Sequence, residues 1–403
     1  MMKNYSPRLW SATFLVAGTS IGAGMIALPI TTAQAGFIPS ISIMALTWII
    51  AMITGLCLIE TGFWMKKSDA HIISMSSTFL GPWCKRLSWL LYLFIAYSSL
   101  IAYTAGGSDL IASALEKLFH IDLSKLQSNL LFMVFFAPVI LISHKTLGKI
   151  NSLFFILLLI SYVLLIFMGT SEIKPELLYR QNWPQCVFSL PMLLAAFSFQ
   201  MMVPSLHPYL HHHKPSLYFS IIVGTFLTFL IYLAWQLIIH GSIPLEGAHG
   251  LDAALEQGDA TVHYFGIHMQ NPYIEKVAAF FAFFALATSF LGISLGLFDF
   301  LSDGLNIPKT RTGSLILTGI IVLPTLFCSI SFKRIFFLAL DVSGGYGDAL
   351  LTGMIPALMV WIGRYRMNKG SLESKMVGGG KTLLLCVFAF YAFVVLIETL
   401  MRI

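Results

Sequence analysis

The stretch Gly18–Pro29, GTSIGAGMIALP, lies inside a long apolar run and carries three glycines, at positions 18, 22 and 24. Each glycine in a helix interior costs about 1 kcal/mol relative to alanine, so we predict that this helix is interrupted. Within a bilayer, unpaired backbone groups are tolerated only where they face protein or a water-filled cavity. The stretch therefore indicates a binding site. The alternative is a packing face, because Gly18 and Gly22 also form a GxxxG motif.

The composition around this stretch is that of a membrane protein. The chain has 403 residues, of which 57% are hydrophobic and only 10% are charged, and its formal net charge is +6. Soluble domains carry about 25% charged residues, so a water-facing globular enzyme is disfavoured. Most basic residues fall in short gaps between apolar runs, so the positive charge does not indicate nucleic-acid binding.

Apolar runs long enough to cross a membrane occupy most of the chain. A bilayer core about 30 Å thick needs about 20 apolar residues of helix, and eleven runs meet that requirement. We therefore predict an all-α integral membrane protein with one polytopic domain over residues 1–403. The expected spans are Leu9–Ala35, Ile38–Met65, Leu87–Ser108, Leu126–Ser143, Asn151–Gly169, Gln185–Pro204, Leu217–His240, Ile274–Asp299, Gly313–Phe332, Gly345–Gly363 and Thr382–Leu400.

The loops between these spans predict an orientation. Cytoplasmic loops carry an excess of Lys and Arg, and with the N-terminus inside, the inner loops hold twice as many of these residues as the outer side. We expect a cytoplasmic N-terminus and a periplasmic C-terminus. The acidic connection Gly241–Tyr273, which has no Lys or Arg, then lies outside. The pair Lys333 and Arg334 fits this orientation poorly.

A second interruption is predicted in the sixth span, at Phe197–Leu206, FSFQMMVPSL. Ser198 and Gln200 interrupt an apolar stretch, and Pro204 removes a backbone donor just beyond them. Interrupted helices at corresponding positions of two halves indicate a transporter site built from inverted repeats. We predict repeats over about 9–169 and 185–363, inverted because each holds five spans, with an accessory helix over 382–400.

Two such breaks suit an amino-acid zwitterion. Exposed N–H groups and the positive end of a half-helix suit its carboxylate, while freed carbonyls and hydroxyls suit its ammonium group. Neither break contains a charged residue. The sequence therefore predicts binding through backbone and hydroxyl groups, with no buried charge needed.

These motifs resemble the hydroxy/aromatic amino-acid permeases, specifically the bacterial tyrosine- and tryptophan-specific permeases of the amino acid–polyamine–organocation superfamily. The resemblance rests on Gly18–Pro29, Val203–Leu206 and Thr288–Phe300, TSFLGISLGLFDF, with Asp303–Leu305. It implies a LeuT-like fold with discontinuous helices 1 and 6, and a proton-driven importer of aromatic amino acids in the bacterial inner membrane. Such permeases usually show Phe-Gly-Phe-His where this chain has Phe197–Gln200, FSFQ.

The expected substrate site surrounds the two breaks. An aromatic substrate needs a flat apolar slot with a few polar groups, and by analogy of fold Tyr103 of the third span faces the first span. Each aromatic side chain here has helix packing as its alternative role. The predicted substrate-binding residues are Gly18, Thr19, Ser20, Gly22, Gly24, Tyr103, Phe197, Ser198, Phe199 and Gln200.

Coupling-ion candidates lie in the eighth span. Ala285, Thr288 and Ser289 place a carbonyl and two hydroxyls on roughly one helical face, and such oxygen ligands suit sodium, which binds at this place in related folds. The alternative is that both hydroxyls bond to carbonyls of their own helix. The resemblance favours a proton, and a sodium-coupled symporter of the same fold stays the alternative.

Other ionisable residues near span interiors are functional suspects by default. Glu60 and Asp299 lie near predicted cytoplasmic ends, where Lys66 or Lys309 is a plausible neighbour, so a gating or structural role competes with protonation. Glu398, near the outer end of the last span, is expected to be solvated.

Histidines follow the second break. His211–His213 lack a fixed ligand geometry and are expected to form a solvated loop. His207 is a weaker candidate for proton transfer.

Several activities are disfavoured. The five cysteines are scattered, so neither a disulfide framework nor a zinc site is expected. No GxxxxGK[ST] motif supports an ATP-driven pump, and outside the His211–His213 loop no acidic or histidine cluster supports an integral-membrane enzyme. We expect a non-enzymatic symporter working by alternating access, with no cofactor or metal apart from its coupling ion. Its partners are an aromatic amino acid and the lipid bilayer, with neither nucleic acid nor an obligatory protein partner.

Overall fold

The computed structural model describes residues 6–65, 71–141, 144–257, 264–266, 268, 272–331, 334–370 and 375–403, and the regular structure in these ranges is helical. The α-helices are α1 (Ser6–Ser20), α2 (Ala23–Thr32), α3 (Phe37–Phe63), α4 (Ile72–Leu80), α5 (Pro82–Phe119), α6 (Lys125–Ile140), α7 (His144–Gly169), α8 (Pro175–Leu178), α9 (Leu190–Ala196), α10 (Val203–Tyr209), α11 (Lys214–Ser242), α12 (Leu251–Gln257), α14 (Pro272–Leu305), α15 (Arg311–Ser331), α16 (Ile335–Val342), α17 (Ile355–Tyr365) and α18 (Gly380–Arg402). Short 3-10 turns are η2 (Ala33–Ala35), η3 (Thr170–Glu172), η4 (Trp183–Ser189) and η5 (Gln200–Met202), and η6 (Ser343–Met354) is a π-helix.

The chain is a multi-pass membrane protein. In its described part, nine helical segments are long and apolar enough to cross a membrane, and the bent pair α1 and α2 makes a tenth. The fourth predicted span, Leu126–Ser143, corresponds to α6, which has 16 residues and falls short of a full crossing. Length and apolarity therefore support nine or ten of the eleven expected crossings.

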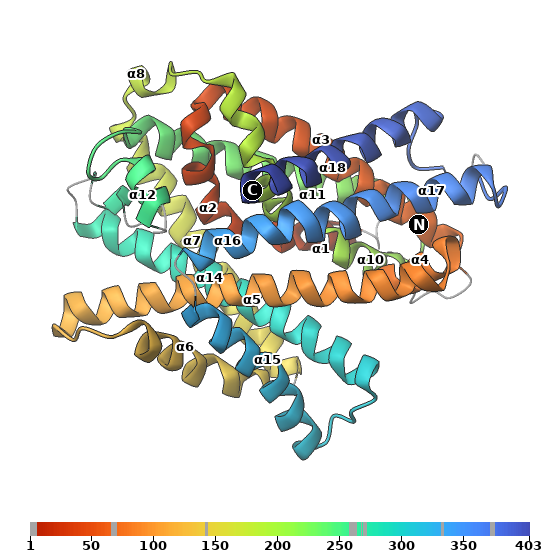
Figure 1. The fold of residues 1–403 in the computed structure, drawn as a ribbon, viewed down its shortest axis with the longest axis horizontal. Coiled ribbons are helices and arrows are strands. Elements are labelled where there is room, and N and C mark those ends of the chain that lie inside the picture. The colour runs from red at the N-terminus through yellow and green to blue at the C-terminus, as the bar shows by residue number, and fades with distance from the viewer. Residues whose placement is uncertain are drawn as a thin grey trace.

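The helices are arranged around α5, which has 38 residues and runs across the molecule (Figure 1). It extends beyond the predicted Leu87–Ser108 because Gly81 and Pro82 begin the helix early and His120, in the left-handed conformation, ends it late. Helices α6 and α15 lie together on one side of α5, and α3, α17 and α18 gather on the other.

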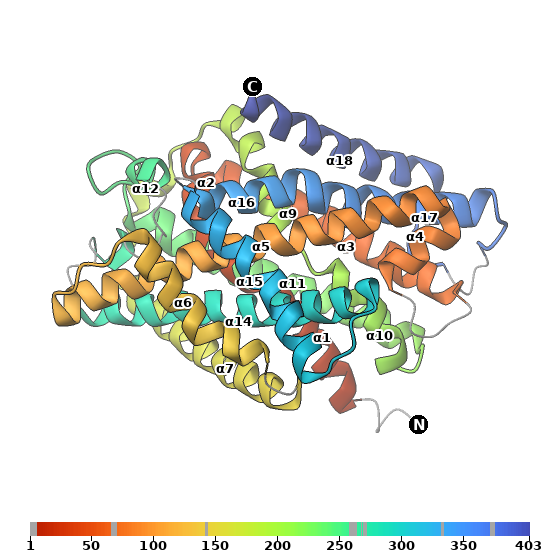
Figure 2. The ribbon, with the colours of Figure 1, turned by 60° about the horizontal axis from the view of Figure 1, so that its bottom comes forward.

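The ends of the bundle alternate as the predicted spans require. Figures 1 and 2 both show α4 and α10 at one end and α8 and α12 at the other. Helices α4 and α10 lie at connections that the sequence places on the cytoplasmic side, and α8 and α12 lie in connections that it places on the periplasmic side. Successive spans therefore run in opposite directions through the bundle.

The tenth span is longer than predicted and contains the π-helix. It runs from Ile335 to Tyr365 through α16, η6 and α17, whereas the sequence predicted Gly345–Gly363, because the apolar helix α16 precedes the predicted start and continues directly into η6. A Cβ at Gly344 would lie 1.9 Å from the carbonyl oxygen of Pro191. The glycine therefore lets η6 approach α9 closely, and η6 comes to lie beside the second interrupted span.

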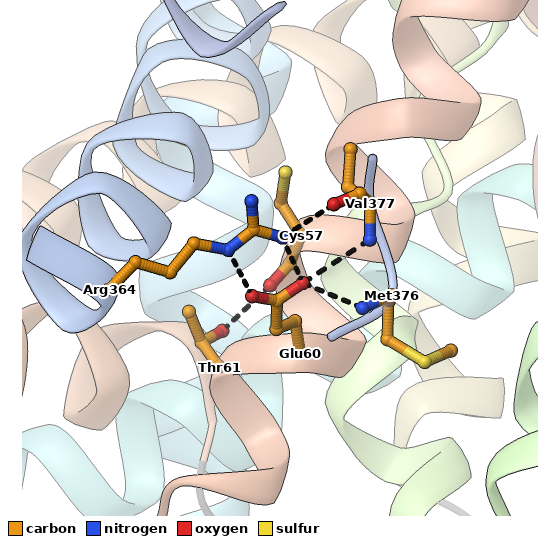
Figure 3. Close-up of polar contacts among 6 residues, drawn as sticks. All are labelled: Cys57, Glu60, Thr61, Arg364, Met376 and Val377. Atoms are coloured by element: carbon orange, nitrogen blue, oxygen red, sulfur yellow. Dashed lines mark hydrogen bonds and ion pairs between the residues drawn. The ribbon is translucent and has the colours of Figure 1, made fainter. Parts of the chain in front are cut away.

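A buried ion pair ties α3 to the C-terminal helices (Figure 3). Glu60 has no exposed side-chain surface, and its two carboxylate oxygens accept from Nε and Nη2 of Arg364, each at 2.6 Å. The backbone N–H groups of Met376 and Val377 donate to Glu60 Oε2 at 2.8 and 3.3 Å. Lys66, a predicted neighbour of Glu60, lies outside the described residues. This clasp joins α3, α17 and the segment before α18.

We predict that Glu60→Gln destabilises the protein by about 3–5 kcal/mol, because Arg364 is then left as a buried charge without its anion. Asp299→Asn is the matched control: Asp299 pairs with Lys309 at 2.6 Å, but both side chains are more than 40% exposed. An exposed pair contributes only about 0–1 kcal/mol. Unfolding of the purified variants in detergent measures both effects, and equal losses would contradict the structural role of the clasp.

Candidate functional site

The first interruption lies where the sequence predicted it. Helix α1 ends at Ser20, α2 begins at Ala23, and the two axes are bent by 52°. The Ala23 N–H donates to Ser289 Oγ at 3.3 Å, so the hydroxyl of Ser289 in α14 serves the start of α2. A Cβ at Gly22 would lie 2.2 Å from the same Oγ atom. Glycine at position 22 is therefore required by this close approach.

The second interruption faces the first. Helix α9 ends at Ala196, and the 3-10 turn η5 precedes α10. A Cβ at Gly24 would lie 2.9 Å from the Cα atom of Ala196, so α2 and α9 touch through their backbones. The two breaks predicted at separate places in the sequence therefore form one region of the structure.

A tyrosine that the sequence analysis did not select connects the two breaks. Tyr232 of α11 is fully buried, and its hydroxyl lies 2.6 Å from the carbonyl oxygen of Ser20 and 2.8 Å from that of Ala196. These are the last carbonyls of α1 and α9, which lack a partner within their own helices. One hydroxyl thus serves both interrupted helices. Tyr232 lies within an apolar span, and no sequence motif around it indicates this role.

A cavity of about 570 Å³ lies at the breaks. Its size falls in the range of small-molecule sites, about 300–1,000 Å³. The predicted residues that line it are Gly18, Thr19, Ser20, Gly22, Gly24, Tyr103, Ser198, Thr288 and Ser289. The structure therefore brings together residues from the first, third, sixth and eighth predicted spans.

The two predicted phenylalanines lie outside this lining. Phe197 is 1% exposed and packs on Tyr232, with ring centroids 5.1 Å apart. Phe199 is equally buried, and its ring lies against Gly55 of α3, where a Cβ would be 2.6 Å away. In this structure both rings pack between helices, the alternative role considered from the sequence.

Gln200 also lies outside the cavity lining. Its Nε2 donates to the carbonyl of Ala51 at 3.3 Å and to Thr54 Oγ1 at 3.2 Å, and its Oε1 accepts from the Phe199 N–H at 3.0 Å. The side chain therefore satisfies backbone groups of α3 and of the second break.

The three ion-coupling candidates lie beside the first break. Thr288 Oγ1 donates to the carbonyls of Phe284 at 2.8 Å and Ala285 at 3.1 Å, which is the bonding within its own helix expected as the alternative. The carbonyl oxygen of Ala285 would be 3.9 Å from a Cβ at Gly22. The hydroxyl oxygen of Ser289 already accepts from the Ala23 N–H at the start of α2. All three groups are thus next to the break and already hydrogen-bonded.

A buried carboxylate joins the site from the tenth span. Asp348 of η6 lines the cavity, is 2% exposed, and accepts from Ser198 Oγ at 2.6 Å through Oδ1. The two breaks contain no charged residue and predicted a site without charge, so this carboxylate differs from the expectation. The available signal was an aspartate inside an apolar span, which is a functional suspect by default.

The other ionisable suspects lie away from the cavity lining. Asp299 pairs with Lys309, as expected. The expectation that Glu398 is solvated is wrong: it has no exposed side-chain surface and accepts from Arg402 Nε at 2.8 Å. Glu398 is buried because α18 packs it against Gly345 of η6.

The histidines also lie away from the cavity lining. His207 is buried, donates to the Ile59 carbonyl at 3.0 Å through Nε2, and has His212 Nδ1 3.3 Å from its own Nδ1. Within the described ranges, no group of three or more His, Cys, Asp or Glu side chains is arranged to hold a metal ion.

Nearly the whole chain matches one protein family. The model of the tryptophan/tyrosine permease family covers residues 5–398. The chain belongs to this family. The resemblance drawn from Gly18–Pro29 and Thr288–Phe300 is thereby confirmed.

Relatives of this permease-family chain match it from end to end. The tyrosine-specific transport system 1 of Haemophilus influenzae is 30% identical, over 93% of this chain and 92% of that protein. The tryptophan-specific transport protein of the same organism is 28% identical, over 94% and 93%. The tryptophan-specific transport protein of Pseudomonas aeruginosa is 27% identical, over 90% and 88%. Their names describe transporters of aromatic amino acids.

We predict that Tyr232→Phe destabilises the protein by about 1–3 kcal/mol, since two buried carbonyls lose their shared donor. Tyr162→Phe is the matched control, because Tyr162 also donates from a buried position to one carbonyl, that of Ile231 at 2.8 Å. Both variants should lose stability on unfolding in detergent. Only Tyr232→Phe should speed hydrogen exchange of the amides at both breaks, and similar exchange in the two variants would contradict the bridging role.

Proposed function

We propose that this chain is a secondary symporter that imports tyrosine or tryptophan across the bacterial inner membrane by alternating access, coupled to protons. The observation that carries the proposal is the cavity between two interrupted helices that face each other. Half-helix ends at membrane depth offer N–H groups to the carboxylate of a zwitterion and carbonyl groups to its ammonium group. An oppositely charged side chain is therefore not needed for each of the two charges. The named activity of the relatives supports the substrate class.

The geometry of the breaks suggests how the zwitterion binds. Its carboxylate is expected at the start of α2, where Ala23 and Gly24 begin a half-helix. Its ammonium group is expected near the end of α1, where Thr19 and Ser20 line the cavity. The carbonyl of Ser20 is shared with Tyr232, so the neighbouring hydroxyls and carbonyls supply the remaining acceptors.

The aromatic ring requires an apolar part of the cavity. Ile95, Tyr103, Phe155, Ile156 and Ile293 line it. Phe155 lies directly against Gly18, where a Cβ would be 3.0 Å from its ring. We infer that this side of the cavity, rather than Phe197 and Phe199, holds the substrate ring.

We infer a LeuT-like inverted repeat with eleven crossings. The support is the spacing of the interruptions: they fall in the first and sixth spans and meet in space, as corresponding elements of residues 9–169 and 185–363 should. Helix α6 would be the fourth crossing, at 16 residues or about 24 Å of helix. The helix over 382–400 would be accessory.

The cavity suggests a conformation open to the cytoplasm. Its lining continues along α1 from the break to Phe14 and Leu15, on the N-terminal side, and in the orientation predicted from Lys and Arg this end is cytoplasmic. At the other end, α11 is bonded to α2: Gln236 Nε2 donates to Thr32 Oγ1 at 2.9 Å, and His240 Nε2 donates to the Pro29 carbonyl at 3.0 Å. Opening to the periplasm would separate these contacts.

A sodium-coupled symporter is the second candidate. The observation in its favour is that Ala285, Thr288 and Ser289 lie beside the first break. The family resemblance drawn from the sequence motifs favours the proton. An integral-membrane enzyme is less favoured still, since the relatives are named as transport proteins.

The test is uptake of labelled tyrosine, tryptophan, phenylalanine and leucine into proteoliposomes, under an imposed pH gradient and separately under a sodium gradient. We expect tyrosine or tryptophan to accumulate under the pH gradient and leucine not to do so. Accumulation that needs sodium would establish the second candidate. Absence of aromatic uptake under both gradients would refute the proposed substrate class.

We predict that Gly292→Leu abolishes this uptake. Gly292 lines the cavity, and a Cβ there meets no other atom within 4 Å, so a leucine would fill the cavity without disturbing the helices. Gly319→Leu is the matched control: it makes the same change in α15, also with open space around the Cβ, but outside the cavity lining. The cavity would not be the transport site if the two variants took up substrate equally well.

A further inference from the structure

The charge distribution at the cavity singles out one residue. Among the described residues that line it, Asp348 is the one with an ionisable carboxyl or basic group. It sits on the π-helix η6, is 2% exposed, and its Oδ1 receives the hydroxyl of Ser198 at 2.6 Å. Ser198 itself belongs to the second break. The carboxylate is therefore attached to the interrupted sixth span.

The groups facing Asp348 supply no positive charge. Tyr103 of α5 and Tyr391 of α18 interact with it electrostatically, and tyrosines are ordinarily neutral at physiological pH. No ion pair in the described part of the chain includes Asp348.

The charged groups on the elements around η6 are engaged elsewhere. Glu60 of α3 pairs with Arg364 of α17, and Glu398 pairs with Arg402 within α18. Asp341 of α16, seven residues before Asp348 on the same span, is a further acid, and the cations that interact with it are Arg402 and Arg334.

A carboxylate in such surroundings is costly to keep charged, so it is stable only when a cation joins it. The cation is expected to come through the cavity, because no ion pair among the described residues supplies one to Asp348. It can be a proton, a metal cation or the ammonium group of the substrate. A proton changes the strength of the bond from Ser198: a protonated carboxyl keeps an acceptor oxygen, but a hydroxyl bonds about half as strongly to it as to an ionised carboxylate.

We propose that Asp348 is the proton-binding group of the transport cycle, an inference that rests on the proposed symport function. With the cavity open to the periplasm, the carboxylate takes a proton from water. Neutralising the carboxyl weakens the hydrogen bond from Ser198, and the sixth-span break can then adopt the substrate-bound arrangement. With the cavity open to the cytoplasm, the proton returns to water and the charge-assisted bond from Ser198 to Oδ1 forms again. Nothing is oxidised or reduced, and one proton crosses per cycle.

The decisive comparison is between net accumulation and exchange. Accumulation driven by a pH gradient requires the proton site. Exchange of labelled for unlabelled amino acid, with no gradient, requires only substrate binding and movement of the loaded carrier. Asp348→Asn imitates the neutral carboxyl in shape and can no longer titrate. In proteoliposomes holding the full chain, it should lose accumulation down to simple equilibration, keep exchange, and make exchange independent of pH.

Two further variants control the result. Asp348→Glu keeps the titratable group and should retain part of the accumulation. Asp299→Asn removes an exposed acid outside the cavity lining and should accumulate substrate as the unaltered chain does. Elution of each variant as a single species in size-exclusion chromatography excludes misfolding as the cause of a loss.

Two outcomes would overturn the proposal. Asp348→Asn that still accumulates substrate under the pH gradient would show that the proton binds elsewhere. A folded Asp348→Asn that loses both accumulation and exchange would show that the carboxylate holds the substrate ammonium instead.

Infrared difference spectroscopy on acidification separates this inference from the proposed function, because it needs no substrate. A protonated-carboxyl band that disappears in Asp348→Asn supports the proton site even if no aromatic amino acid is transported. Absence of any such difference between Asp348→Asn and the unaltered chain would overturn the proton site, even where transport is driven by protons.

Discussion

The structure depends on the need to pair backbone polar groups inside a membrane. Two interrupted helices each present unpaired carbonyls and N–H groups where no lipid can bond to them. Tyr232 meets this need for the ends of α1 and α9 together, and Ser289 meets it for the start of α2. Since one hydroxyl serves two helix ends, the breaks must lie side by side, and the cavity lies where they meet.

Buried charge in this protein falls into two kinds. Glu60 is paired with Arg364, and Glu398 is paired with Arg402. The first pair joins α3 to α17, and the second lies at the C-terminal end of α18. Asp348 lines the cavity and has a hydroxyl for a partner instead of a cation. Paired charges satisfy each other and stabilise the packing. A carboxylate that needs a visiting cation is suited to a carrier that must change its state during each cycle.

Much of the candidate site could be predicted from local sequence. The glycines of the first break and Ser198 of the second line the cavity, because helix-breaking residues create the backbone groups that surround it. The aromatic residues were harder to place. Phe197 and Phe199 lie next to a break in the sequence, but their side chains pack between helices and do not line the cavity. The reason is that a broken helix no longer projects its side chains at a regular angle.

The sequence by itself determined the membrane class, the approximate spans, the two interruptions and the family, because hydropathy, glycine content and short motifs are local properties. Only the tertiary structure decided that Tyr232 joins the breaks, that Arg364 neutralises Glu60, and that Asp348 meets Ser198. The partners in each of these contacts lie between 36 and 304 positions apart. No periodicity in the sequence relates residues that far apart, and their meeting follows from how the helices pack.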